Sequence, residues 1–258
     1  MTDRGLQEAI RAVGGVTELA RRIGISQPSV SNWSRVPAER VLNVEAITGV
    51  ARAILRPDLY DENNQTAGID ETDLARAQEY ALLAALVSRA PDADLLKRLA
   101  TLRGDPTPLG LAHLSLADAA AGADATKVER EFFNLFIGIG RGELMPYGSY
   151  YIAGFLHERP LARLREDLAA LGIERAEGEY ESEDHAAILC EIMSGIAGGQ
   201  FPAQAGADRQ LFEKHLAPWL GRFFTDLERS QAADFYRCVG TLGRVFIEIE
   251  SEAYALTD

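Results

Sequence analysis

The sequence has few cysteines and no long apolar run. Cys190 and Cys238 stand far apart, so the chain supports neither a disulfide framework nor a Cys-x-x-Cys metal or redox site. Both thiols are expected to be buried. The longest apolar run, residues 81–87, is much shorter than the roughly 18 residues of a membrane-spanning helix, so no membrane partner is expected. The amino terminus lacks the apolar segment of a secretory signal, which predicts a cytoplasmic protein.

Catalytic signatures are also missing. The four histidines occur without metal-ligand spacing, and no nucleotide-binding glycine loop or nucleophile elbow is present. The glycine-rich run 138–142 has neither the preceding strand nor the lysine that phosphate binding uses. The paired acids Glu183 and Asp184 would do acid–base work only inside a substrate cleft, which nothing else indicates. The chain is therefore predicted not to be an enzyme and to bind no cofactor or metal.

Charge is distributed unevenly along the chain. Residues 1–60 hold eight arginines against six acids, a net charge of +2, and the total of −13 leaves −15 for the remainder. Because phosphate attraction dominates non-specific DNA affinity, the acidic remainder is a poor candidate for nucleic-acid binding. Its charge would instead attract a basic peptide.

Helical spacing of apolar residues continues along almost the whole chain, and the alternation typical of half-buried strands is missing, so an all-α fold is predicted. The polar stretch 57–72 has the composition of a linker. We predict a helix-turn-helix domain at 1–60, a linker at 61–72 and an all-helical bundle at 73–258. Helices of the bundle are expected at 74–86, 95–102, 109–121, 128–139, 151–171, 183–196, 211–227 and 233–255.

Residues 6–48 carry the boundary signals of four short helices, at 6–13, 17–23, 27–34 and 38–48. Thr17 and Ser26 are natural N-caps, and Gly24 stands where the chain needs a positive φ to turn into the next helix. This punctuation is typical of a helix-turn-helix. A small core is expected from Leu19, Ile23, Ile25, Val30 and Trp33.

The outward face of the third short helix is polar. Such side chains can hydrogen-bond base edges or phosphates in the major groove of double-stranded DNA. Arg21, Arg22 and Arg40 are expected to contact the DNA backbone, and tight operator binding by so small a module would require a homodimer. The alternative is a helical module used for protein contacts. The predicted DNA-binding residues are Gln27, Ser29, Ser31, Asn32, Arg35 and Arg40.

This segment resembles the YdaS or Cro-like helix-turn-helix family. The resemblance rests on residues 14–20 (GGVTELA), 23–27 (IGISQ), 30–33 (VSNW), 36–40 (VPAER) and 55–60 (LRPDLY). It implies a λ-repressor-like DNA-binding fold in which the helix beginning at Gln27 enters the groove.

Aromatic residues are densest between Phe132 and Phe155, flanked by Glu129, Glu131 and Glu143. The loop 138–151 is too glycine-rich for a helix, so phenol hydroxyls are expected to be exposed there. A tyrosine-lined groove rimmed by carboxylates would suit a peptide with both apolar and basic residues. Core packing is the alternative for Phe132, Phe133 and Phe136, and the better groove candidates are Tyr147, Tyr150 and Tyr151.

A second cluster, at residues 179–185, precedes an apolar helix. Two interpretations stay open from spacing alone. In one, Ser182 or Glu181 caps the helix and the neighbouring acids favour its dipole. In the other, Asp184 and His185 clamp a guanidinium or respond to pH.

These segments resemble the TorD/DmsD family of redox-enzyme maturation chaperones. The resemblance covers residues 74 to about 255 and rests on 76–86 (RAQEYALLAAL), 129–138 (EREFFNLFIG), 145–151 (MPYGSYY) and 181–185 (ESEDH). It implies an all-α chaperone that binds the precursor of a molybdenum oxidoreductase, often at its twin-arginine signal peptide. By this resemblance the peptide-binding residues are Tyr147, Ser149, Tyr150, Asp184 and His185, and the aromatic pattern adds Tyr151. The chain departs from the family at Met145 and Ser182, where proline is usual.

Two functional hypotheses follow. One is a cytoplasmic maturation chaperone with an appended DNA-binding module. The other is a transcriptional regulator whose carboxy-terminal domain senses a ligand or client. The chaperone hypothesis expects a negatively charged, tyrosine-lined trough that brings Asp184 and His185 together with the tyrosines and binds guanidinium-bearing leader segments.

Overall fold

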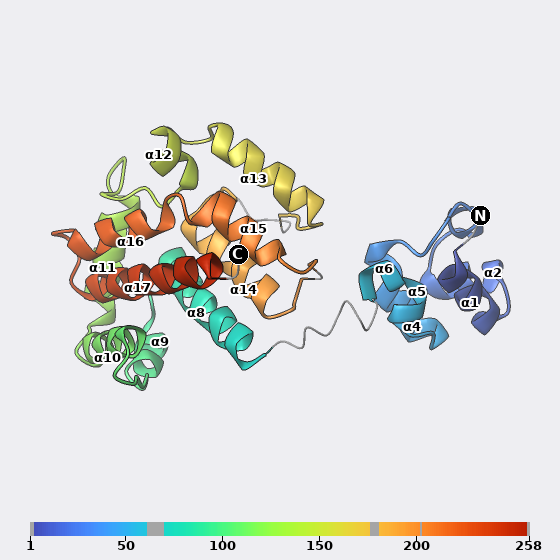
Figure 1. The fold of residues 1–258 in the computed structure, drawn as a ribbon, viewed down its shortest axis with the longest axis horizontal. Coiled ribbons are helices and arrows are strands. Elements are labelled where there is room, and N and C mark those ends of the chain that lie inside the picture. The colour runs from blue at the N-terminus through green and yellow to red at the C-terminus, as the bar shows by residue number, and fades with distance from the viewer. Residues whose placement is uncertain (1–2, 61–69, 176–180, 202, 257–258) are drawn as a thin grey trace. The chain divides into compact units, whose positions relative to one another are not determined.

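The computed structural model describes residues 3–60, 70–175, 181–201 and 203–256. The chain divides into two compact units, residues 1–70 and 71–258, each of which has its own helices and core. Within the described ranges the extended pairing is limited to a single isolated bridge, and the rest of the regular structure is helical (Figure 1), which confirms the all-α prediction. In these ranges no helix is both long and apolar enough to cross a bilayer.

The amino-terminal unit is built from short helices around a small apolar core. Of the predicted core, Leu19, Ile23 and Val30 are buried, and Ile25 and Trp33 pack against them partly buried. The helices are α1 (Arg4–Val13), α2 (Val16–Ile23), α3 (Gln27–Ser31), a 3₁₀ turn (Ala38–Arg40), α4 (Val41–Thr48), α5 (Arg52–Leu55) and α6 (Pro57–Tyr60).

The turn between α2 and α3 has the predicted geometry. Gly24 has a φ of 81°, and the Ser26 hydroxyl accepts a hydrogen bond from the Ser29 amide. Two boundaries were predicted wrongly. Gly15, not Thr17, precedes α2, and α3 ends at Ser31 rather than at residue 34. The helix α3 ends early because the chain continues in a tighter turn, in which the Trp33 amide donates a hydrogen bond to the Val30 carbonyl.

The carboxy-terminal unit is a helical bundle in which α12 and α13 run along the outside (Figure 1). Glu71 and Thr72, which were predicted to belong to the linker, are already part of its first helix, whereas residues 61–69 of that predicted linker lie outside the described ranges. The helices are α8 (Glu71–Ser88), α9 (Ala93–Leu99), α10 (Pro108–Ala121), α11 (Ala125–Phe132), α12 (Gly148–Ala153), α13 (Arg159–Ala170), α14 (Ala186–Ala197), α15 (Ala207–Leu211), α16 (Leu220–Arg229) and α17 (Phe235–Ala255).

Three helices predicted as continuous are interrupted. The first changes from α11 to a π-helical turn, Phe133–Ile137, and stops at Gly138, whose φ is 61°. The second breaks between α12 and α13 at Gly154, which has a φ of 84°. The third contains a π-helical turn, Phe212–Leu216, before α16. Glycines in the left-handed region end two of these helices, because that conformation cannot continue a right-handed helix.

The two cysteines differ in their surroundings. Cys190 is fully buried in the core, and this burial raises the pKa of its thiol to about 12. Cys238 is only partly buried and lies 3.5 Å from the Ser115 hydroxyl. The expectation of two buried thiols is therefore wrong for Cys238, which lies near the surface of α17.

Candidate functional site

The two segments predicted to bind peptide lie side by side in the carboxy-terminal unit. Tyr147 and His185 form an antiparallel bridge. On either side of it, the Gly148 amide donates to the Asp184 carbonyl at 2.9 Å, and the Ala186 amide donates to the Pro146 carbonyl at 2.8 Å. We call residues 146–149 and 182–186 the junction. Backbone pairing thus joins two segments that are about 35 residues apart in sequence.

Asp184 is the polar centre of the junction. The residue is only 3% exposed. One carboxylate oxygen accepts from the Ser149 amide at 2.7 Å, and the other accepts from the Ser182 hydroxyl at 2.6 Å. Both oxygens are therefore used within the fold, which argues against Asp184 as an open clamp for a guanidinium.

His185 begins the helix that follows the junction. Its Nδ1 accepts a hydrogen bond from the Ala187 amide at 3.1 Å, so His185 is the N-cap of α14. The interpretation in which Ser182 or Glu181 caps this helix is wrong. Residues 179 and 180 of the predicted cluster lie outside the described ranges.

Ser149 lies inside α12, which corrects the expectation that residues 138–151 contain no helix. Gly148 permits this close packing, because a Cβ there would lie 3.0 Å from Trp219 Nε1. Ser149 is fully buried, and its hydroxyl has no hydrogen-bond partner within the described residues.

Two of the three candidate tyrosines are held by carboxylates. The Tyr147 hydroxyl donates to Glu181 at 2.9 Å, and the Tyr151 hydroxyl donates to Asp226 at 3.0 Å. Burial, followed by these carboxylates, raises the pKa of both phenols above the ordinary value. Tyr150 is half-buried, and its hydroxyl has no partner in the described part of the chain. The three tyrosines are thus partly buried, and the hydroxyls of Tyr147 and Tyr151 are hydrogen-bonded within the fold.

The phenylalanines of this region divide into two that pack against the core and one that is exposed. Phe132 and Phe136 pack against the core with their rings 5.0 Å apart. Phe133 is 40% exposed, so the core interpretation fails for that residue.

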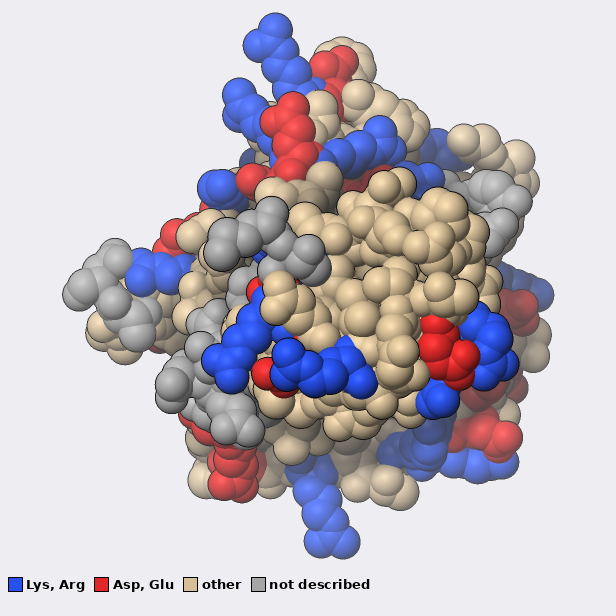
Figure 2. All heavy atoms as spheres, turned by 90° about the vertical axis from the view of Figure 1, so that its right-hand side faces the viewer, with Lys and Arg blue, Asp and Glu red and all other residues tan. Residues whose placement is uncertain are grey.

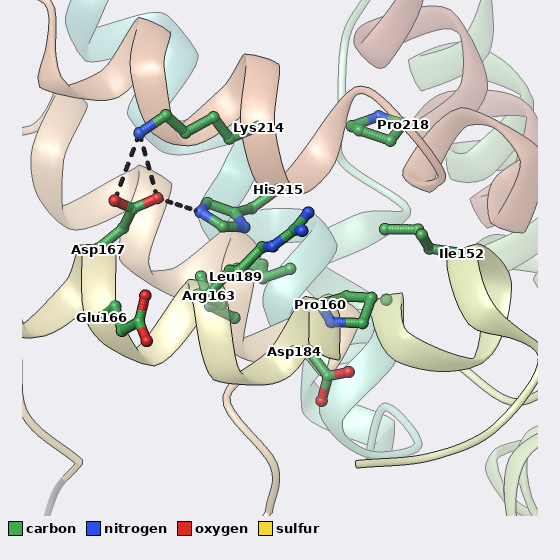
Figure 3. Close-up of a pocket in the computed structure, with 12 residues that line it drawn as sticks. Ile152, Pro160, Arg163, Glu166, Asp167, Asp184, Leu189, Lys214, His215 and Pro218 are labelled. Carbon is green, nitrogen blue, oxygen red and sulfur yellow. Dashed lines mark hydrogen bonds and ion pairs between the residues drawn. The ribbon is translucent and has the colours of Figure 1, made fainter. Parts of the chain in front are cut away.

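A cavity of about 510 Å³ opens beside the junction (Figure 3). It lies against α12, α13 and the π-helical turn at residues 212–216. No sequence pattern pointed to this cavity, because most of its residues belong to no recognised motif. The cavity is lined by Gly148, Ile152, Pro160, Arg163, Leu164, Glu166, Asp167, Asp184, Leu189, Lys214, His215 and Pro218.

One wall of the cavity holds an ion-pair cluster. Asp167 accepts from His215 Nε2 at 2.7 Å and lies 3.3 Å from Lys214 Nζ. The His215 hydrogen bond and the Lys214 charge lower the pKa of Asp167. Arg163 and Glu166 also line the cavity, but neither forms an ion pair or side-chain hydrogen bond with the described residues. Within the described residues, Asp167, Lys214 and His215 therefore bind one another, whereas the side chains of Arg163 and Glu166 have no charged partner.

The candidate DNA-binding residues lie on and after α3. Gln27, Ser29, Ser31, Asn32 and Arg35 are exposed and Arg40 is half-buried. Local bonds occupy part of this surface, since Gln27 donates to the Ser31 hydroxyl at 2.8 Å. Arg21 and Arg22, which were expected to contact the DNA backbone, both form ion pairs with Glu18. On the side of the molecule drawn in Figure 2, basic and acidic side chains are interspersed around a broad uncharged area.

The two units are similar to two different protein families. Residues 6–64 match the family described as bacterial toxin YdaS. Residues 102–225 match the family described as nitrate reductase delta subunit. Chaperone protein TorD from Vibrio cholerae serotype O1 (El Tor Inaba) is 28% identical over 127 residues, which cover 46% of this chain and 58% of the relative.

Over these matched residues the larger unit is similar to TorD. TorD from the classical Ogawa strain of the same species matches with the same identity and coverage. The chain spans 58% of the length of these curated TorD relatives. Among solved structures, a redox enzyme maturation protein from Archaeoglobus fulgidus is 19% identical in sequence to this chain, with a TM-score of 0.45. The match covers 68% of this chain and 93% of that protein. The TorD relatives are named as chaperones, in agreement with the prediction that the chain is not an enzyme.

Proposed function

We propose that the chain is a cytoplasmic maturation chaperone that binds the precursor of a redox enzyme through its TorD-like unit. The observation that carries the proposal is the junction. Its two segments are among the four on which the TorD resemblance depends, and backbone hydrogen bonds join them next to a cavity. Because a cavity with a few convergent polar groups is the usual form of a binding site, the chaperone's recognition site is proposed to lie there.

The proposed client is a molybdenum oxidoreductase precursor bound at its twin-arginine signal peptide. The geometry supports two roles among the predicted peptide-binding residues. Tyr147, Ser149, Tyr151, Asp184 and His185 shape the site through bonds inside the fold. Tyr150, whose hydroxyl has no partner among the described residues, is the member that contacts peptide.

Calorimetric titration of the full chain tests this function. The ligands are a twin-arginine signal peptide and the same peptide with both arginines replaced by lysine. We expect tighter binding of the arginine peptide, because a guanidinium offers a planar fork of donors to carboxylates and an ammonium does not. No binding, or equal binding, would contradict the proposal. Molybdenum content of the client, measured with and without the chaperone in cells, tests the identity of its metal.

The second candidate is a DNA-binding regulator, favoured by the YdaS match and by the exposed polar side chains of α3. In this proposal double-stranded DNA is the partner and a homodimer is the binding species. Retention of promoter fragments by the full chain at several salt concentrations tests it. Affinity that falls as salt rises is expected, since phosphate contacts release counterions. Absent binding, with Arg21 and Arg22 paired to Glu18, would leave the amino-terminal unit as a protein-contact module.

A further inference from the structure

The carboxylates around the cavity are not equivalent. Asp184 accepts two hydrogen bonds from the junction, and Asp167 is paired with Lys214 and His215. Glu166 lies one residue from Asp167 on α13, is exposed, and has no partner among the described residues. Glu166 is therefore the cavity carboxylate whose hydrogen-bonding capacity is open to a ligand.

The charge of the lining favours a cation. Three acids (Glu166, Asp167 and Asp184) face two bases (Arg163 and Lys214), a net charge of −1 with His215 neutral. The charges of Asp167 and Lys214 cancel, so two negative charges, on Glu166 and Asp184, remain beside one positive charge, on Arg163. Figure 3 shows Arg163 and Glu166 extending from the same helix, with the guanidinium of Arg163 turned toward the space between His215 and Ile152. A peptide suits this pair, because its main-chain carbonyls can accept from Arg163 while its own basic side chain reaches Glu166.

An apolar surface continues from the cavity along α12 and the turn after it. Ile152 lines the cavity and is 45% exposed, Phe155 is 71% exposed, and Leu156 is 36% exposed. The half-buried Tyr150 lies on α12 with Ile152, before the turn that holds Phe155 and Leu156. Three large exposed apolar side chains within five residues, one of which lines the cavity, are characteristic of an interaction surface.

We propose that these features form one two-part site: Glu166 receives a guanidinium of a leader peptide in the cavity, and Ile152, Phe155 and Leu156 receive the apolar segment of the same peptide. This inference rests on the proposed function and assigns its specificity to residues outside the recognised motifs. The occupant is chosen by complementarity, because an export leader carries a basic segment beside an apolar one. Glu166 in the cavity would pair with the basic segment of the leader, and Ile152, Phe155 and Leu156 would pack against its apolar segment.

The experiment titrates the full chain and its variants with three synthetic leader peptides. One has two arginines and the apolar segment, the second has lysines in place of the arginines, and the third keeps the arginines but has serines in the apolar segment. The variants are Glu166→Gln and Phe155→Ser. Matched controls are Glu191→Gln, an exposed carboxylate on α14, and Leu111→Ser, a leucine on α10 that is 57% exposed. All four positions are exposed, and circular dichroism verifies that each variant folds.

Glu166→Gln is expected to weaken the first peptide about tenfold, in the range of a charge-assisted hydrogen bond, and to remove the preference for arginine over lysine. Phe155→Ser is expected to weaken the first peptide and to leave the serine peptide unchanged. The controls should match the unmodified chain. If the unmodified chain binds none of the peptides, the proposed function fails. If it prefers the arginine peptide but Glu166→Gln or Phe155→Ser binds as tightly as its control, the two-part site is wrong while the proposed function stands.

Discussion

The junction and the cavity wall are neighbouring regions that satisfy their polar groups in opposite ways. In the junction, Asp184, His185 and Tyr147 use their hydrogen bonds within the fold itself. On the cavity wall, Arg163 and Glu166 have charges that the described residues leave unpartnered. Under the proposed function, most of the motif residues in the junction position the site, and Arg163 and Glu166, which belong to no motif, join Tyr150 as open binding groups.

Stability measurements should separate the two regions most clearly. Asp184→Ala is expected to lower the free energy of unfolding by about 3 kcal/mol, because it leaves the Ser149 amide and the buried Ser182 hydroxyl without their acceptor. Glu166→Ala should change it by less than about 0.5 kcal/mol. Urea unfolding followed by circular dichroism compares the two variants. Equal losses would remove the distinction between junction and cavity wall.

Acid titration should show a smaller effect on stability, which arises from Glu183 in the junction. Partial burial raises the pKa of Glu183, but hydrogen bonds from Arg165 and Arg175 together outweigh it and lower that pKa to about 2. The folded chain thus holds this proton more weakly than the unfolded chain, so the stabilisation is complete above pH 4.5 and is lost as the pH falls toward 2.

Because Arg165 is half exposed, solvent limits the contribution to about 1 kcal/mol. The measurement is urea unfolding at several pH values, for the unmodified chain and for Glu183→Gln. The variant should lose less stability over that pH range. Parallel pH curves would show that the two arginines do not stabilise the charged carboxyl.

The smallest expected effect has the opposite sign. Ser149→Ala removes a buried hydroxyl that has no partner among the described residues, so the free energy of unfolding should stay the same or rise by up to about 1 kcal/mol. Thermal unfolding of this variant beside the unmodified chain measures the change. A loss above about 1 kcal/mol would mean that the hydroxyl has a stabilising hydrogen bond.

Local signals predicted much of the fold. Ser26 and Gly24 mark the helix-turn-helix correctly because caps and left-handed glycines are determined by a few neighbouring residues. The break at Gly154 was missed, since apolar spacing continues on both sides of that glycine. Helical periodicity alone does not show where a chain reverses.

The candidate site was predictable only as a meeting of two segments. Their resemblance to TorD associated Tyr147 and Asp184 with one site. It did not predict their hydrogen bonds to Glu181 and to the Ser149 amide, because these partners come from the other segment and are brought near by tertiary packing. Glu166 carries no local signal at all. It is distinguished from Asp167 only by the Lys214 and His215 side chains that reach the latter from another part of the chain.

Hydrogen exchange of the full chain, with and without a saturating twin-arginine leader peptide, tests the central claim most directly. Binding across the cavity and α12 predicts slower amide exchange within residues 148–167, and little change in residues 27–35. A bound peptide that protects only residues 27–35, or that leaves 148–167 unprotected, would contradict the account.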